Sequence, residues 1–137
     1  MKHRPIKNRF PELDVKASGL SFYGFDGKLM SLGQWTSLIE HSEQTVTSTF
    51  INGQGKKYWI STVLLGMDYS FGYGPRPILF ETMVFESGPN GIREIMGRYS
   101  TIQQARKGHR KAVQGLRLML TERRRMYGPL LSNGRKP

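Results

Sequence analysis

The chain has 137 residues, a formal net charge of +11, 37% apolar residues and no cysteine. This length suits a single domain with a core of its own, and the missing cysteines exclude a disulfide framework and any thiolate-bound metal. No segment reaches the ~20 consecutive apolar residues of a membrane-spanning helix, and the basic start lacks the apolar stretch of a signal peptide. We therefore expect a protein without a membrane anchor that works in a cytoplasm.

The excess positive charge lies at the two ends of the chain. Residues 106–136 hold ten basic residues and one acid, and the first nine residues hold four more basic ones. The part between them is slightly acidic overall. We interpret residues 1–19 as a basic N-terminal arm, 20–127 as a single domain and 128–137 as a basic C-terminal tail. Two basic ends on a mildly acidic body favour a polyanionic partner.

Residues 20–41 predict a hairpin followed by a short helix. Two apolar runs are joined by Asp26-Gly27, a dipeptide typical of tight turns between strands. Ser31 and Gln34 then match the capping-box spacing at the start of a helix, and the apolar residues behind them share one helical face as far as residue 41.

The middle of the chain, residues 45–98, predicts the main sheet. β-branched and aromatic residues fill 45–51 and 58–67, with a Gly-containing turn between the two runs. After a Gly- and Pro-rich loop, residues 78–86 are largely apolar on both faces, which is typical of a central strand. Residues 87–98 predict a turn and a short edge strand.

The sequence pattern after residue 99 predicts a long amphipathic helix. It begins with a capping box at Ser100 and Gln103 and ends near residues 127–129. Gly108 and Gly115 fall inside it, at a cost of about 1 kcal/mol each, so we expect its backbone to pack closely there. Its apolar side holds Ile102, Ala105, His109, Ala112, Val113, Leu116, Met119 and Leu120. The predicted fold is α+β: an antiparallel sheet of four or five strands, built with two hairpins, a short helix, and the long C-terminal helix packed on one face.

The opposite side of this helix is basic, and no acid interrupts it before Glu122. Like charges at helical spacing repel one another, and a bound polyanion would relieve that repulsion. The alternative is that this side is simply solvent-exposed and that its positive charge has no function. Arg123 falls on the apolar side, so we expect the helix to run past the edge of the sheet there. The candidate nucleic-acid- or partner-binding residues are Lys107, Arg110, Lys111, Arg117, Arg123, Arg124, Arg125, Arg135 and Lys136, with Lys56 and Lys57 at the second turn and Tyr69 and Tyr73 in the loop.

Aromatic residues accompany the basic ones in several strands and loops, as is common in proteins that bind single-stranded nucleic acid. Tyr58 and Trp59 lie in a predicted strand and are interpreted as core. Tyr69 and Tyr73 lie in the Gly- and Pro-rich loop and are better candidates for an exposed surface.

The candidates for catalysis are Asp68, Glu81 and His109. Glu81 is placed among apolar neighbours in a strand, where its pKa is expected to rise, and His109 faces inward from the last helix. The interpretation we favour is structural, with Glu81 paired to His109 or to an arginine in a satisfied network. No spacing typical of a metal site occurs, and we expect a binding protein without cofactor or metal rather than an enzyme.

Three runs, Ser61–Asp68, Phe80–Phe85 and Arg98–Thr101, are followed by Ala105, Gly108 and His109. This order resembles a pattern of small uncharacterised proteins of tailed bacteriophages and prophages, written loosely as STVxLGLD…FETMVF…RYST…A..GH. Members of that family often have His after the Asp, where this chain has Tyr69, and the departure weakens any shared catalytic role. The resemblance covers about residues 22–113 and implies a phage origin and a host-cell cytoplasm as the workplace.

The leading hypothesis is a phage-encoded, non-enzymatic protein that binds nucleic acid, DNA or RNA, or a nucleoprotein through its C-terminal basic helix. One alternative is a protein-directed inhibitor of a host defence complex, with the basic face on an acidic or nucleoprotein partner. Another is a virion-associated structural component, and a hydrolase using Asp68, Glu81 and His109 is the last. The sequence does not set the oligomeric state.

Overall fold

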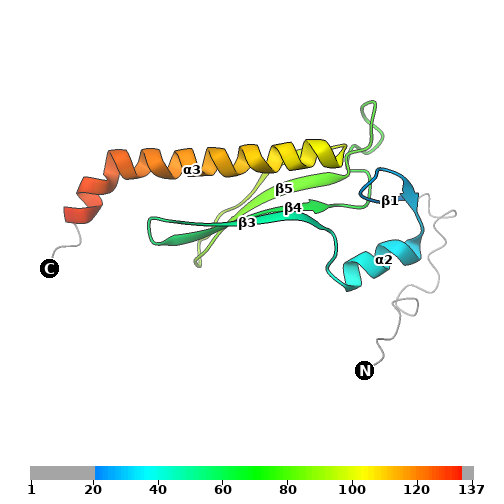
Figure 1. Cartoon of the computed structure of the whole chain (residues 1–137), viewed down its shortest axis with the longest axis horizontal. Helices are drawn as coiled ribbons and strands as arrows, with labels where there is room; N and C mark the ends of the chain where they lie inside the picture. The colour runs from blue at the N-terminus through cyan, green and yellow to red at the C-terminus, as the bar shows by residue number, and fades with distance from the viewer. Residues whose placement is uncertain (1–20, 134–137) are drawn as a thin grey trace, which may run out of the picture.

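The computed structural model describes residues 21–133 and the side chains of residues 21–127. It has an α+β fold, as predicted, with a two-stranded and a four-stranded antiparallel sheet, a short helix and a long C-terminal helix (Figure 1). The elements in chain order are β1 (Phe22–Tyr23), β2 (Leu29–Met30), α2 (Leu32–Glu40), β3 (Thr45–Gly53), β4 (Lys56–Leu64), β5 (Phe80–Glu86), β6 (Arg93–Tyr99) and α3 (Ile102–Asn133). The predicted arm at residues 1–19, and Arg135 and Lys136, lie outside the described residues.

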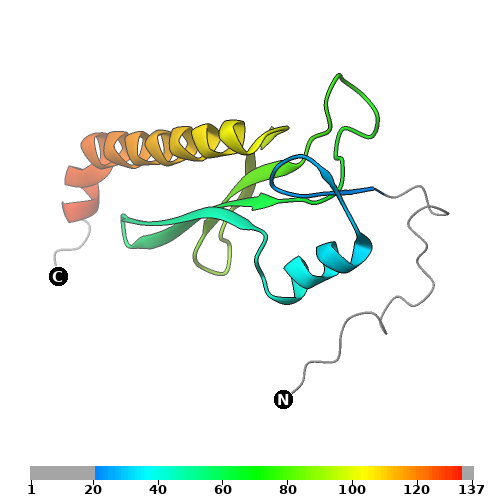
Figure 2. The same cartoon turned by 45° about the vertical axis from the view of Figure 1, so that its right-hand side comes forward.

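The N-terminal part follows the local signals closely. β1 and β2 pair around the turn that contains Asp26-Gly27, and Asp26 Oδ1 accepts a hydrogen bond of 2.9 Å from Lys28 N. At the start of α2, Ser31 Oγ accepts from Gln34 N while Gln34 Oε1 accepts from Ser31 N, so the predicted capping box is present. Figure 2 places these elements at one end of the larger sheet, beside the start of α3.

The larger sheet is an antiparallel meander in the order β3-β4-β5-β6. β5 is therefore a central strand, as its two apolar faces predicted, and β3 and β6 form the edges. β3 turns into β4 at Gln54-Gly55, where both residues have a positive φ, the geometry that tight hairpins require. The predicted edge strand within residues 87–98 is confirmed as β6.

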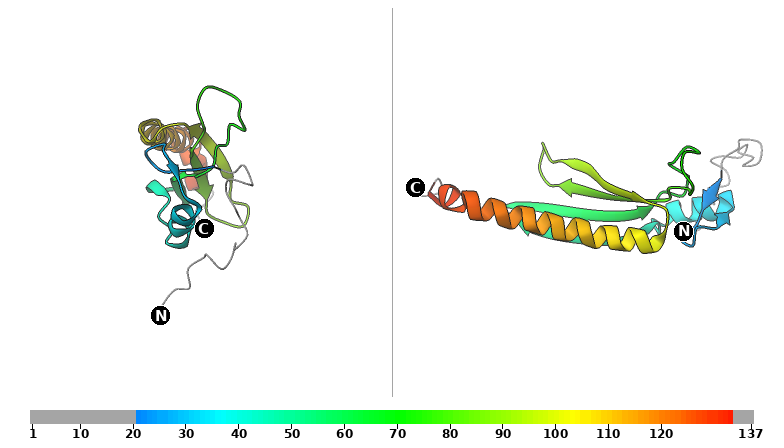
Figure 3. Two further views of the ribbon diagram at one scale, coloured as in Figure 1. Left: turned by 90° about the vertical axis from the view of Figure 1, so that its right-hand side faces the viewer. Right: turned by 90° about the horizontal axis from the view of Figure 1, so that it is seen from above.

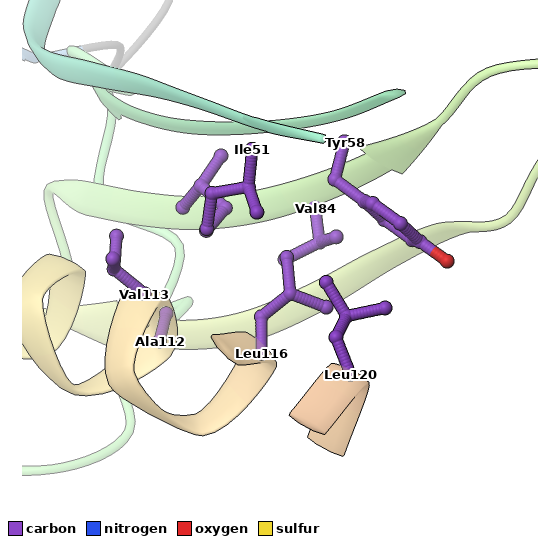
Figure 4. Packing of buried hydrophobic residues seen from close by; sticks show 8 residues of the cluster. Ile51, Tyr58, Val84, Ala112, Val113, Leu116 and Leu120 are labelled. Atoms are coloured by element: carbon purple, nitrogen blue, oxygen red, sulfur yellow. The ribbon is translucent and has the colours of Figure 1, made fainter. Parts of the chain in front are cut away.

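α3 lies along one face of this sheet and contacts all four strands (Figure 3, right). Because side chains alternate along a strand, every second residue of β3, β4 and β5 faces the helix. Figure 4 shows this core, in which Tyr58 is buried as predicted. Its members are Ile51, Tyr58, Ile60 and Val84 from the sheet, and Ala112, Val113, Leu116 and Leu120 from α3.

A second core joins the N-terminal elements to the sheet. Leu64, Leu79, Phe80 and Ala105 are buried there, and Trp35 of α2 packs against them. The Trp35 ring lies directly on Gly66, where a Cβ would overlap the ring. Only glycine therefore fits at position 66.

Helix α3 differs from the prediction at both ends. Its cap is Thr101 rather than Ser100: Thr101 Oγ1 accepts from Gln104 N at 3.2 Å, and Gln104 Oε1 accepts from the backbone of residues 100 and 101. The Ser/Thr-x-x-Gln spacing that predicted a cap at Ser100 and Gln103 also occurs one residue later, at Thr101 and Gln104. The helix also continues to Asn133 and bends in its last turns (Figure 1), because a Gly-Pro pair weakens and kinks a helix without always ending it.

The two glycines inside α3 have different surroundings. A Cβ on Gly108 would overlap the Tyr99 ring, so the predicted close packing is correct at this position. A Cβ on Gly115 would meet nothing within 4 Å, so the same prediction is wrong there. Met119, expected on the apolar side, is also partly exposed, because it lies at the margin of the stripe that the sheet covers.

Candidate nucleic-acid interface

The basic side of α3 is exposed over the described part of the helix, opposite the buried stripe of Ala105, His109, Ala112 and Leu116. From Lys107 to Arg124 the helix rises about 25 Å, comparable to several phosphate spacings along a nucleic-acid strand. The basic residues on this surface, all exposed, are Arg106, Lys107, Arg110, Lys111, Arg117, Arg124 and Arg125. Arg123, on the apolar side of the helix, is exposed as well.

None of these basic residues takes part in an ion pair among the described side chains. The ion pairs there are Lys56–Glu86 and Arg98–Glu81, both within the sheet. No described acidic side chain therefore neutralises these charges directly, and a phosphate backbone that bound here would displace the counterions around them.

The last described turns of α3 extend past the sheet, as the position of Arg123 predicted (Figures 1 and 3). At the β3–β4 turn, Gln54 Nε2 donates to Leu120 O at 3.3 Å, and the Leu120 side chain packs against Gly53. Beyond this contact the helix has no sheet beneath it. The cluster Arg123–Arg125 therefore lies on the overhanging part, where its side chains are exposed.

The two lysines of the β3–β4 hairpin have different roles from those of α3. Lys56 Nζ lies 2.6 Å from Glu86 Oε1, and this hydrogen bond and charge raise the pKa of Lys56. The positive charge of Arg123 acts against that rise in the pKa of Lys56. Lys57 alternates with Tyr58 and so faces away from α3. The Gly-rich segment before them is a hairpin turn, as predicted, and not a phosphate loop.

His109 belongs to a buried hydroxyl network between α3 and the sheet. Its Nε2 lies 2.8 Å from Thr49 Oγ1 and its Nδ1 lies 2.8 Å from Thr62 Oγ1, which in turn lies 2.6 Å from Thr82 Oγ1. Burial lowers the pKa of His109 below its usual value because the charged ring would lose its hydration. Both ring nitrogens have partners, so the side chain serves as a polar anchor of the core.

Glu81 faces the opposite side of the sheet. Arg98 Nε donates to Glu81 Oε2 at 2.8 Å, and the guanidinium lies 5.4 Å from the centre of the Tyr69 ring. The interpretation of Glu81 as the partner of an arginine is therefore confirmed. The proposed cluster with His109 is not formed, because Glu81 and its neighbour Thr82, which reaches the His109 network, point to different faces.

Asp68, the third catalytic candidate, holds the loop before β5. Its Oδ1 accepts hydrogen bonds of 2.8 Å from Ser70 N and from Ile78 N, ten residues farther along the chain. Burial acts to raise the pKa of Asp68, but these hydrogen bonds outweigh it and lower the pKa. Within the described chain, no three His, Asp or Glu side chains gather into a possible metal site.

The prediction that the loop tyrosines are exposed is confirmed for Tyr73 but only in part for Tyr69. Tyr73 is 83% exposed and Phe71 is 78% exposed, whereas Tyr69 is half-buried between Phe71 and Arg98. Tyr69 thus borders the side of the sheet that carries Glu81 and Arg98, not the basic side of α3.

The sequence interpretation missed an aromatic row on this open face, the side of the sheet turned away from α3. Trp59, interpreted as core, is 40% exposed there, because it lies on the side of the sheet opposite α3. It stacks between Phe50 and Phe85, with ring centres 5.9 and 4.9 Å apart. The alternation of Tyr58 and Trp59 indicated that they lie on opposite faces, but not which face the helix would cover.

No protein-family model matches the chain, and neither a curated protein nor a solved structure matches it. The resemblance to bacteriophage proteins therefore stays a prediction. Within residues 21–133, no helix combines the length and the apolar composition that crossing a membrane requires.

Proposed function

We propose that the protein binds nucleic acid without enzymatic activity, through the basic side of α3, in the cytoplasm of a phage-infected cell. The observation that carries this proposal is the exposed row of cations from Arg106 to Arg125, which has no acid before Glu122 and no ion-pair partner among the described side chains.

The structure of α3 suits contacts with phosphates. A helix held along a sheet presents its cations on a stiff rod, so less side-chain and backbone freedom is lost on binding than from a flexible basic tail. The overhanging cluster of Arg123, Arg124 and Arg125 extends this row beyond the sheet. Contacts of this kind give affinity and orientation but carry little sequence information, because every nucleotide has the same phosphate.

The arrangement of the catalytic candidates supports a binding role. Asp68, Glu81 and His109 each have hydrogen-bond partners of their own, in three different places. A hydrolase would need an acid or base beside an electrophilic group at one site.

Binding can be tested by fluorescence anisotropy with labelled duplex DNA, duplex RNA and single strands at low salt. We expect binding of at least one probe, with little dependence on sequence. Absence of binding to all of them would overturn the proposal. A protein that is captured from host lysate and stays bound after nuclease treatment, with no binding to the probes, would instead favour the protein-directed alternative.

A further inference from the structure

The open face carries a row of side chains that crosses all four strands. Phe50 pairs with Trp59 in the β3–β4 register, Trp59 with Phe85 in the β4–β5 register, and Phe85 with Arg93 in the β5–β6 register. The planes of Phe50 and Trp59 are 6° apart and those of Trp59 and Phe85 are 26° apart. The row is thus a stack of three rings with a cation at one end.

The other end of the stack has a free ring face. Phe50 is 73% exposed and belongs to the edge strand β3, so Trp59 is its only ring neighbour in the described chain. Trp59 is fixed by a 2.6 Å hydrogen bond from its Nε1 to Ser48 Oγ. An exposed ring with a stiff backing loses little freedom on binding, which favours stacking of a further flat group on its outer face.

The charges of this face are positive. Lys57 and Arg93 are exposed on it, and neither has an ion-pair partner among the described side chains. Glu81 is the acid that the described strands place on this side, and Arg98 neutralises it. Lys57 lies one row from Phe50, diagonally across the β3–β4 pair, which is within reach of a long side chain.

We propose that the open face is a second nucleic-acid site, which takes single-stranded DNA or RNA. One base stacks on the outer face of Phe50, and the adjacent phosphates lie near Lys57, with Arg93 at the far end of the row. Paired bases in a duplex are already stacked and cannot lie flat on a side chain, so the site selects unpaired strands. It is separate from α3, on the other side of the sheet, and does not depend on the function proposed above.

The test is the binding of a fluorescein-labelled oligo(dT) of about ten nucleotides, the span of an ordinary single-strand site. Phe50→Ala should weaken binding about 5- to 100-fold, the range seen when one stacked base loses its aromatic partner. The matched control is Leu29→Ala, which removes an apolar side chain that is 69% exposed on β2, outside both proposed sites; it should bind like the natural protein. Because Phe50 is on the surface, its removal should leave the fold intact, as circular dichroism can verify.

Two further variants separate the two sites. The double variant Arg110→Gln/Arg117→Gln should weaken duplex binding, while the part of oligo(dT) binding that depends on Phe50 remains. In a Phe50→Trp variant, oligo(dT) should quench the added fluorescence, whereas duplex DNA should not. Equal oligo(dT) affinities of Phe50→Ala and Leu29→Ala would overturn the inference, as would an unquenched Phe50→Trp. A dimer that forms with rising protein concentration and shields the added Trp without oligonucleotide would assign the face to a second copy of the chain and overturn it as well.

Discussion

Replacing Gly108 and Gly115 by alanine, one at a time, tests the packing of α3 with two chemically identical changes. Both glycines are interior to the helix, so alanine should stabilise each position by about 1 kcal/mol through helix propensity alone. Their surroundings differ: a Cβ at Gly115 meets nothing within 4 Å, whereas one at Gly108 overlaps the Tyr99 ring. The two variants should therefore change stability in opposite directions.

The magnitude at Gly108 follows from the position of Tyr99. Its ring lies between Gly97 and Gly108, and a Cβ on either glycine would meet ring atoms, so the ring cannot move aside without disturbing β6. Overpacking of this kind costs about 1–3 kcal/mol, more than the propensity gain in most of that range. We expect Gly108→Ala to lose about 1 kcal/mol of unfolding free energy and Gly115→Ala to gain about 1 kcal/mol.

Urea unfolding followed by circular dichroism measures both changes, and thermal melting should show them as midpoint shifts of about 4 °C down and up. In a Tyr99→Leu background the ring is absent, and Gly108→Ala should then stabilise as Gly115→Ala does. A Gly108→Ala variant as stable as Gly115→Ala in the natural background would refute the packing of α3 on β6.

The remaining predictions concern two buried polar side chains, His109 of α3 and Glu81 of β5. Burial lowers the pKa of His109 below 6.5 in the folded protein, so its contribution to stability is complete above about pH 6.5 and is lost as the pH falls through the folded pKa, by at most about 1.4 kcal/mol per pH unit. His109→Gln should flatten this part of the pH–stability curve in urea titrations, and an unchanged slope would contradict the assignment. Glu81→Gln should lower the unfolding free energy by about 1 kcal/mol, a modest loss because water reaches the Arg98 side chain, which is 38% exposed. An unchanged melting temperature would show that this pair is not a structural contact.

Local signals in the sequence predicted most of the elements. The capping box of Ser31 and Gln34 is closed by two hydrogen bonds within four residues, so its geometry is nearly independent of the rest of the chain. The turn at Asp26-Gly27 and the amphipathic pattern of α3 are similar cases. The end of α3 was less predictable. A Gly-Pro pair disfavours helix, but the helical residues before and after the pair favour continuation of the helix through it.

The candidate sites required knowledge of which sheet face α3 covers. β4 carries Tyr58 and Trp59 next to each other, both large and aromatic, so the sequence pattern alone could not assign one to the core and the other to the surface. The separation of Glu81 from His109 has the same origin. Glu81 was expected among apolar neighbours and His109 on the inward face of the helix, but α3 covers only the side of the sheet to which Thr82 points.

The exposure of the basic side of α3, in contrast, follows from helical periodicity once the apolar stripe is known. The structure adds the absence of ion-pair partners among the described side chains and the overhang beyond Leu120. The overhang was expected from the position of Arg123 on the apolar side of the helix. The absence of ion-pair partners among the described side chains could not be read from the sequence, because it depends on where the acidic side chains of the sheet lie.

The salt dependence of duplex DNA binding tests the role of α3 most directly. The natural protein is compared with Arg110→Gln/Arg117→Gln and with the control Lys28→Gln/Arg76→Gln, which loses the same charge at exposed positions outside α3. Each lost phosphate contact should reduce the log–log slope by about 0.9, so the α3 variant should be less steep by about 2 while the control keeps the natural slope. Equal slopes for the two variants would contradict the account, because they would show that net charge, and not the basic side of α3, holds the nucleic acid.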